Sequence, residues 1–125
     1  MYLQNGTIQL YRNIDIFQPH CKFELYSISE QGRTVKPDSF VVVRVVDRRD
    51  DVSTAWPLYA GLELAVDGGP MHKTFSTKIY LESKLQPDVY RMDCMQWDWI
   101  NTGEFVSISQ MRQALGGYFT LTLAK

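Results

Sequence analysis

Alternation of apolar and polar residues is the feature of this sequence that most restricts its fold. It is cleanest from Thr74 to Leu81, where the residues predicted to point inward are Phe75, Thr77, Ile79 and Leu81. Side chains of a strand point alternately to two faces, so a half-buried strand has this period. The same period recurs in short segments separated by turn-forming residues, at 7–11, 21–28, 58–66, 89–95 and 118–123. These segments predict an antiparallel all-β fold.

The segment Phe40–Val46 (FVVVRVV) is the most apolar run of the chain. A continuous apolar run predicts a strand covered on both faces or a central strand of a sandwich. The charged residues 47–54 then predict a loop. Residues 58–66 and 74–81 predict a hairpin across the turn at 67–70, with a short amphipathic helix as the alternative for 58–66.

One segment, Ser107–Gly117, is typical of a helix. Ser107 and Gln110 match the capping box, in which each side chain satisfies the backbone N–H of the other residue. Gly116 is suited to a C-terminal cap in the left-handed region. One face of this helix, over about 107–116, carries Ile108, Met111 and Leu115.

Together these elements predict a single domain over residues 1–125, a β-sandwich or jelly roll of seven or eight strands with one short helix. A partly open β-barrel is the alternative. The 125 residues form a core large enough to fold without a disulfide or metal. A net charge of −1, with no basic stripe, disfavours a nucleic-acid partner. No apolar stretch is long enough to predict a membrane span.

Cys21 and Cys94 are the only cysteines. No signal peptide is visible, so we expect synthesis in the cytoplasm and two buried free thiols. Assembly into a particle that is later released is compatible with the same sequence. With His20 and His72 these cysteines do not have the spacing of a zinc site, and no metal or other cofactor is predicted.

The segment from Val89 to Phe105 (VYRMDCMQWDWINTGEF) is the most informative for function. Its first half predicts a strand with Tyr90, Met92 and Cys94 in the core. Beyond Met95 the large residues change parity, which indicates either a β-bulge near Gln96 or tryptophans outside the sheet.

The candidate contact residues follow this strand. They are Trp97, Trp99, Asp98, Asn101 and Glu104, extended by Trp56, Tyr59 and Tyr80. The two tryptophans can close the end of the core, form a subunit interface, or stack on sugar rings. The carboxylate pairs Asp93/Asp98 and Asp98/Glu104 are the residues that acid–base catalysis would use. No nucleophile motif accompanies them, and no catalytic residue is predicted.

These observations favour a non-enzymatic structural or assembly protein. We expect a β-sandwich subunit of a larger particle, such as a virion or a secretion apparatus, that makes protein–protein contacts with itself or with other subunits. The first alternative is a carbohydrate-binding module that uses exposed tryptophan and tyrosine. The second is a hydrolase that uses the acidic residues near Trp99.

Overall fold

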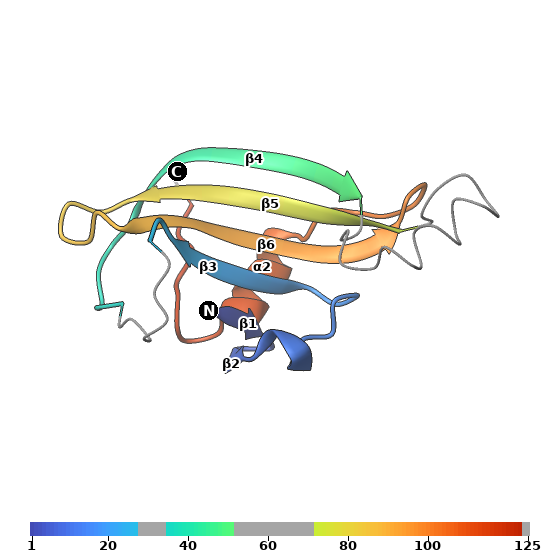
Figure 1. Ribbon diagram of the computed structural model, residues 1–125, viewed down its shortest axis with the longest axis horizontal. Coiled ribbons are helices and arrows are strands. Elements are labelled where there is room, and N and C mark those ends of the chain that lie inside the picture. The colour runs from blue at the N-terminus through green and yellow to red at the C-terminus, as the bar shows by residue number, and fades with distance from the viewer. Residues whose placement is uncertain (28–34, 52–71, 124–125) are drawn as a thin grey trace.

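The computed structural model describes residues 1–27, 35–51 and 72–123. Six strands of these residues form one open antiparallel sheet in the order β2-β1-β3-β6-β5-β4, and a short helix lies against one face (Figure 1). The strands are β1 (Tyr2–Gln4), β2 (Thr7–Gln9), β3 (His20–Leu25), β4 (Val41–Asp51), β5 (His72–Glu82) and β6 (Val89–Trp99). The helices are the 3-10 turn η1 (Tyr11–Asn13) and α2 (Ile108–Leu115). The predicted antiparallel, mostly β fold is confirmed, whereas a sandwich of seven or eight strands is not.

Strands β5 and β6 are neighbouring interior strands of the sheet. All four residues of β5 that were predicted to point inward are buried: Phe75, Thr77, Ile79 and Leu81. Along most of their length β5 and β6 pair without interruption, so Ile79 lies opposite Met92 and Thr77 lies opposite Cys94. We call the face that carries these residues the inner face and the opposite one the outer face.

Helix α2 covers the inner face over β1 and β3. The predicted capping box is present: the Gln110 backbone N–H donates to Ser107 Oγ at 3.1 Å, and the Ser107 N–H donates to Gln110 Oε1 at 2.8 Å. Met111 and Leu115 are buried as predicted, but Ile108 in the first turn is exposed. The core under the helix consists of Leu3, Cys21, Phe23, Ile79, Leu81, Val89, Met92, Cys94, Val106, Met111, Ala114 and Leu115.

Two glycines bring the end of α2 against the turn between β1 and β2. Gly6 and Gly116 have φ angles of +77° and +58°, and the Gly6 N–H donates to the carbonyl of Ala114 at 3.0 Å. The positive φ predicted at Gly116 is confirmed, although its ψ of −133° lies outside the left-handed helical region. A Cβ at Gly116 would lie 2.5 Å from the Cα of Gly6, so the contact requires glycine.

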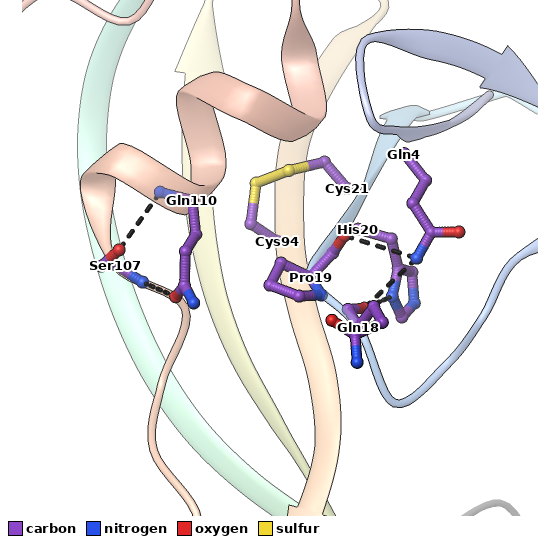
Figure 2. The surroundings of a disulfide bond; sticks show 8 residues. All are labelled: Gln4, Gln18, Pro19, His20, Cys21, Cys94, Ser107 and Gln110. Atoms are coloured by element: carbon purple, nitrogen blue, oxygen red, sulfur yellow. Dashed lines mark hydrogen bonds between the residues drawn. A yellow bond between two sulfur atoms is a disulfide. The ribbon is translucent and has the colours of Figure 1, made fainter.

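The expectation of free thiols is wrong, because Cys21 and Cys94 form a disulfide. The two residues lie directly opposite each other on β3 and β6, and both are fully buried beside α2 (Figure 2). Burial was predicted for both. Their pairing depends on strand order, which the alternation pattern does not contain.

Strand β4 is also placed differently from the prediction. The segment Phe40–Val46 was expected at the centre of the fold or under cover on both faces, and residues 47–54 were expected in a loop. Instead β4 runs from Val41 to Asp51 and lies at the edge of the sheet, paired only with β5 among the described residues.

Both terminal segments differ from their predicted strands. The strand predicted at 7–11 is shortened to β2, and its apolar residues Ile8 and Leu10 are exposed. Residues 118–123 form no strand, but Phe119 and Leu121 pack against the core. Phe119 stacks on Phe23 with ring centroids 5.0 Å apart, whereas Leu123, which was also predicted to point inward, is exposed. The hairpin partner at 58–66 and its turn lie outside the described residues.

Candidate interaction surfaces

The outer face of β6 carries Trp97 and Trp99 of the candidate site. Pairing with β5 is continuous from Trp99 to Arg91, so neither the bulge near Gln96 nor its alternative, tryptophans outside the sheet, is present. The irregularity lies at the other end of β6, where Leu25 pairs with Val89 and Tyr90 is skipped. Val89 therefore takes the core position that was predicted for Tyr90.

Four rings form an aromatic cluster at the end of this face: Phe17, His72, Trp97 and Trp99. The imidazole of His72 lies on the Trp99 indole, with centroids 4.4 Å apart. Phe17 makes edge contacts with His72 at 5.4 Å and with Trp97 at 5.9 Å. Trp97 is half-buried by these contacts, whereas 50% of Trp99 remains exposed. The tryptophans therefore lie outside the inner core, and Trp99 presents an accessible ring.

The loop that supplies Phe17 is held by the buried side chain of Gln4. Its Nε2 donates to the carbonyl of Asp15 at 2.8 Å, and its Oε1 accepts from the Asp15 N–H at 3.0 Å. The Trp97 N–H donates to the carbonyl of Ile16 at 2.8 Å and fixes the loop against β6. Figure 2 shows Gln4 directed at the loop residues beside the disulfide. The contribution of Phe17 could not be predicted, because it depends on a loop held by a distant side chain.

The polar candidate residues lie on β6 and in the segment that follows it. Asp98 lies on the opposite face of β6 and accepts backbone N–H groups from Trp99 at 2.9 Å and from Glu104 at 3.4 Å. Asn101 and Glu104 are exposed in the turn that follows β6. Trp56 and Tyr59 lie outside the described residues.

Tyr80 belongs to a different surface at the other end of the outer face. This tyrosine–arginine cluster consists of Tyr26, Tyr80, Tyr90, Arg44 and Arg91. Tyr26 stacks on Tyr90 at 4.5 Å, and Arg44 lies over the Tyr80 ring at 4.4 Å. Hydrogen bonds from Arg91 and Arg44 lower the pKa of Tyr80. The outward alternation of β5 indicated Tyr80, but only the register of three strands brings the arginines to it.

Charged side chains occupy the middle of the outer face. Lys78 donates to Asp93 at 2.7 Å, and both groups are largely buried. Arg91 pairs with Glu24 in the next row. Asp93 and Asp98 thus lie on opposite faces of β6, and this carboxylate pair does not converge.

Among the described residues, no group of three or more histidine, cysteine or acidic side chains is placed to hold a metal ion. The disulfide also occupies both sulfur atoms of the zinc site considered from the sequence.

His20 is buried near Asp93, in the row of charged residues on the outer face. Its Nδ1 lies 2.9 Å from the carbonyl of Gln18, so that nitrogen donates. Burial lowers the pKa of His20, although the Gln18 carbonyl and the charges of Asp93 and Asp15 act in the opposite direction. The imidazole is therefore neutral in the folded protein near neutral pH.

This histidine predicts a pH-dependent stability. Below a pH of about 6.5 the unfolded chain protonates His20 before the folded protein does, so stability falls as the pH decreases from there toward the lower folded pKa. The loss is at most about 1.4 kcal/mol per pH unit. Urea unfolding of the wild type and of His20→Gln measures this loss between about pH 7.5 and about pH 5, a range that includes the ordinary histidine pKa of about 6.5. We expect a shallower decline in the variant, and equal slopes would contradict the assignment.

Edge strand β4 forms a third exposed surface. Val41, Val42, Val43 and Val45 are 43–64% exposed. Val42 and Val45 lie on the inner-face side, where α2, which packs on β1 and β3, does not shield them. A long apolar strand at a sheet edge presents backbone N–H and C=O groups together with apolar side chains, and natural proteins usually block or cover such edges.

No protein-family model, curated protein or solved structure matches this chain. In the part of the chain that the structure describes, no helix combines the length and apolar character needed to cross a membrane.

Proposed function

We propose that this protein is a non-enzymatic assembly module that joins a larger particle through the exposed edge of β4. The observation that carries the proposal is the row of four exposed valines along β4. Isolated apolar side chains are common on protein surfaces, but a contiguous apolar patch is typical of an interaction site. Burial of these side chains and pairing of a further strand with β4 would both favour association.

The disulfide supports assembly outside the reducing cytosol. Disulfides persist in secreted proteins, at cell surfaces and in virions, and are rare in the cytosol. A subunit of a released particle, such as a virion component or part of a secretion apparatus, meets this condition. We therefore propose that the chain is made in the cytoplasm and reaches a final location where Cys21 and Cys94 stay oxidised.

Lysine at the β4 edge tests the proposal. The double variant Val43→Lys/Val45→Lys places two charges where an incoming strand would pack, which is how natural edges avoid pairing. Both sites are at least half exposed, so we expect a change in unfolding free energy within about 0.5 kcal/mol. Association, measured by light scattering and by co-purification from the cells that express the protein, should weaken at least tenfold, about 1.4 kcal/mol.

Ile8→Lys is the matched control, because Ile8 is exposed to a similar degree on edge strand β2 at the other end of the sheet. This variant should keep the association of the wild type. A wild-type protein that stays monomeric and recovers no partner would contradict the proposal. Equal association by the wild type and the β4 variant would contradict the use of this edge.

A second candidate function is glycan binding at the aromatic cluster. The half-exposed indole of Trp99, backed by His72, offers a flat ring of the kind on which sugars stack. The carboxylate of Asp98, one of the candidate contact residues, accepts hydrogen bonds from backbone N–H groups. The ring alone therefore favours this candidate, and it ranks below assembly.

Tryptophan fluorescence separates the two candidates. If Trp99 binds glycans, a glycan panel should quench the emission of the wild type, and Trp99→Ala should lose the response while keeping its circular dichroism. Trp97→Ala serves as a comparison, because Trp97 is shielded by Phe17. An emission unchanged by every glycan would remove this candidate and leave the β4 edge.

A further inference from the structure

Strand β4 is divided by charge into two halves. Val41–Val46 is apolar except for Arg44, whereas residues 47–51 read Asp-Arg-Arg-Asp-Asp. Arg48 and Asp50 form an ion pair with each other at 3.4 Å, and their side chains remain 58% and 45% exposed. From this division, and resting on the proposed function, we infer that the partner of β4 is an extended segment of a different protein. That segment runs antiparallel to β4, with its charged residues first and its β-branched apolar residues after them.

The antiparallel direction follows from the sheet. All pairings that the structure describes are antiparallel. Parallel strands occur almost only where both faces of a sheet are covered, and β4 has exposed residues on both of its faces. An added strand that continues the existing ladder therefore runs against β4.

A second copy of β4, paired antiparallel with the first, does not match charged residues with opposite charges and valines with apolar residues. In an antiparallel pair, residues directly opposite share a face, so a two-fold axis must pass beside one residue and its own copy. An axis beside any charged residue places two like charges together. An axis beside Val46 places Arg44 opposite Arg48 in both halves of the interface.

An axis beside Val45 is the remaining position within the regular part of β4, because the pairing with β5 shifts at Val43. It places Arg44 opposite Val46 and sets Val43 and Val42 against the charged half. Like charges directly opposite destabilise a sheet, and a charge opposite valine gains no ion pair. Each self-pairing centred within the regular part of β4 thus places at least one pair of like charges opposite each other or leaves charges opposite valines, which a heterologous segment can avoid.

The chemistry of the complementary segment follows residue by residue. Its first four positions lie opposite Asp50, Arg49, Arg48 and Asp47, and complementarity requires basic, acidic, acidic and basic side chains. The next two lie opposite Val46 and Val45 and favour β-branched residues. An acidic residue then meets Arg44, whose guanidinium is held in place over the Tyr80 ring.

Two synthetic peptides test the inference on the full-length oxidised protein. The matched peptide reads Lys-Glu-Glu-Lys-Val-Ile-Glu-Val-Thr. The control reads Glu-Lys-Lys-Glu-Val-Ile-Glu-Val-Thr, with the same composition and net charge. Fluorescence anisotropy and amide chemical shifts should show at least tenfold tighter binding of the matched peptide, with shifts along β4 that are absent in Val43→Lys/Val45→Lys.

The outcomes separate this inference from the proposed function. Equal binding of both peptides along β4 would overturn the charge order while supporting the edge as a binding site. Wild-type self-association that is lost in the β4 variant would overturn a heterologous partner and support assembly through the edge. Failure of either peptide to shift β4 amides would overturn the inference, and unchanged particle assembly by the β4 variant would overturn the proposed function.

Discussion

Replacing both cysteines with alanine is expected to lower the free energy of unfolding by about 4 kcal/mol. Cys21 and Cys94 are 73 residues apart in sequence, so the disulfide closes a long loop in the unfolded chain. The cross-link removes much of the conformational entropy that the unfolded chain would otherwise have. Domains of this size have a free energy of unfolding of about 5–15 kcal/mol, so the variant retains only part of the native stability.

Urea unfolding of Cys21→Ala/Cys94→Ala, compared with the wild type before and after reduction, measures this effect. The reduced wild type should unfold close to the midpoint of the double variant, because both lack the cross-link. Since both cysteines are fully buried between β3, β6 and α2, we expect reduction to require partial unfolding and to be slow in native buffer. An unchanged midpoint in the double variant would show that the cross-link does not stabilise the fold.

Gly116→Ala is expected to lower the free energy of unfolding by about 3 kcal/mol. A methyl group at this position would lie 2.5 Å from the Cα of Gly6, a backbone atom that can move only with the β1–β2 turn. The φ of +58° adds a penalty of about 1–2 kcal/mol for a residue with a side chain, and the overpacking adds about 1–3 kcal/mol. The hydrogen bond from the Gly6 N–H to Ala114 would also be disturbed.

The next residue provides the control. Gly117 has open space where a Cβ would be added, and its φ is not in the positive region. Gly117→Ala should change the unfolding free energy by less than about 1 kcal/mol, in either direction. Thermal or urea unfolding of the two variants in parallel distinguishes the tight contact from a general intolerance of alanine after α2. Equal losses would contradict the explanation by close approach.

Local elements were predictable because their signals lie within a few residues of one another. The capping box joins Ser107 to Gln110, and the alternation of β5 identified all four of its inward residues. Gly116 was identified as a helix end for the same reason. Its contact with Gly6 was not predicted, because that contact joins residues more than a hundred positions apart.

The candidate surfaces were predictable only in part. Trp99 was identified, and it is exposed, but its ring neighbours His72 and Phe17 come from other parts of the fold. The tyrosine–arginine cluster needed the register of β3, β4, β5 and β6. The valine run was predicted in the core because apolar residues are usually buried, but β4 lies at the edge of the sheet, with β5 as its only neighbouring strand in the described part of the chain.

By itself, the sequence determined that the chain forms antiparallel strands and one capped helix, because period and capping are local properties of the backbone. The tertiary structure alone decided that Cys21 meets Cys94, that Trp97 and Trp99 lie on the outer face, and that β4 is an edge strand of the sheet formed by the described residues. The physical reason is that alternation shows which side chains share a face of a strand. It does not show which strand lies alongside, or whether that face is covered.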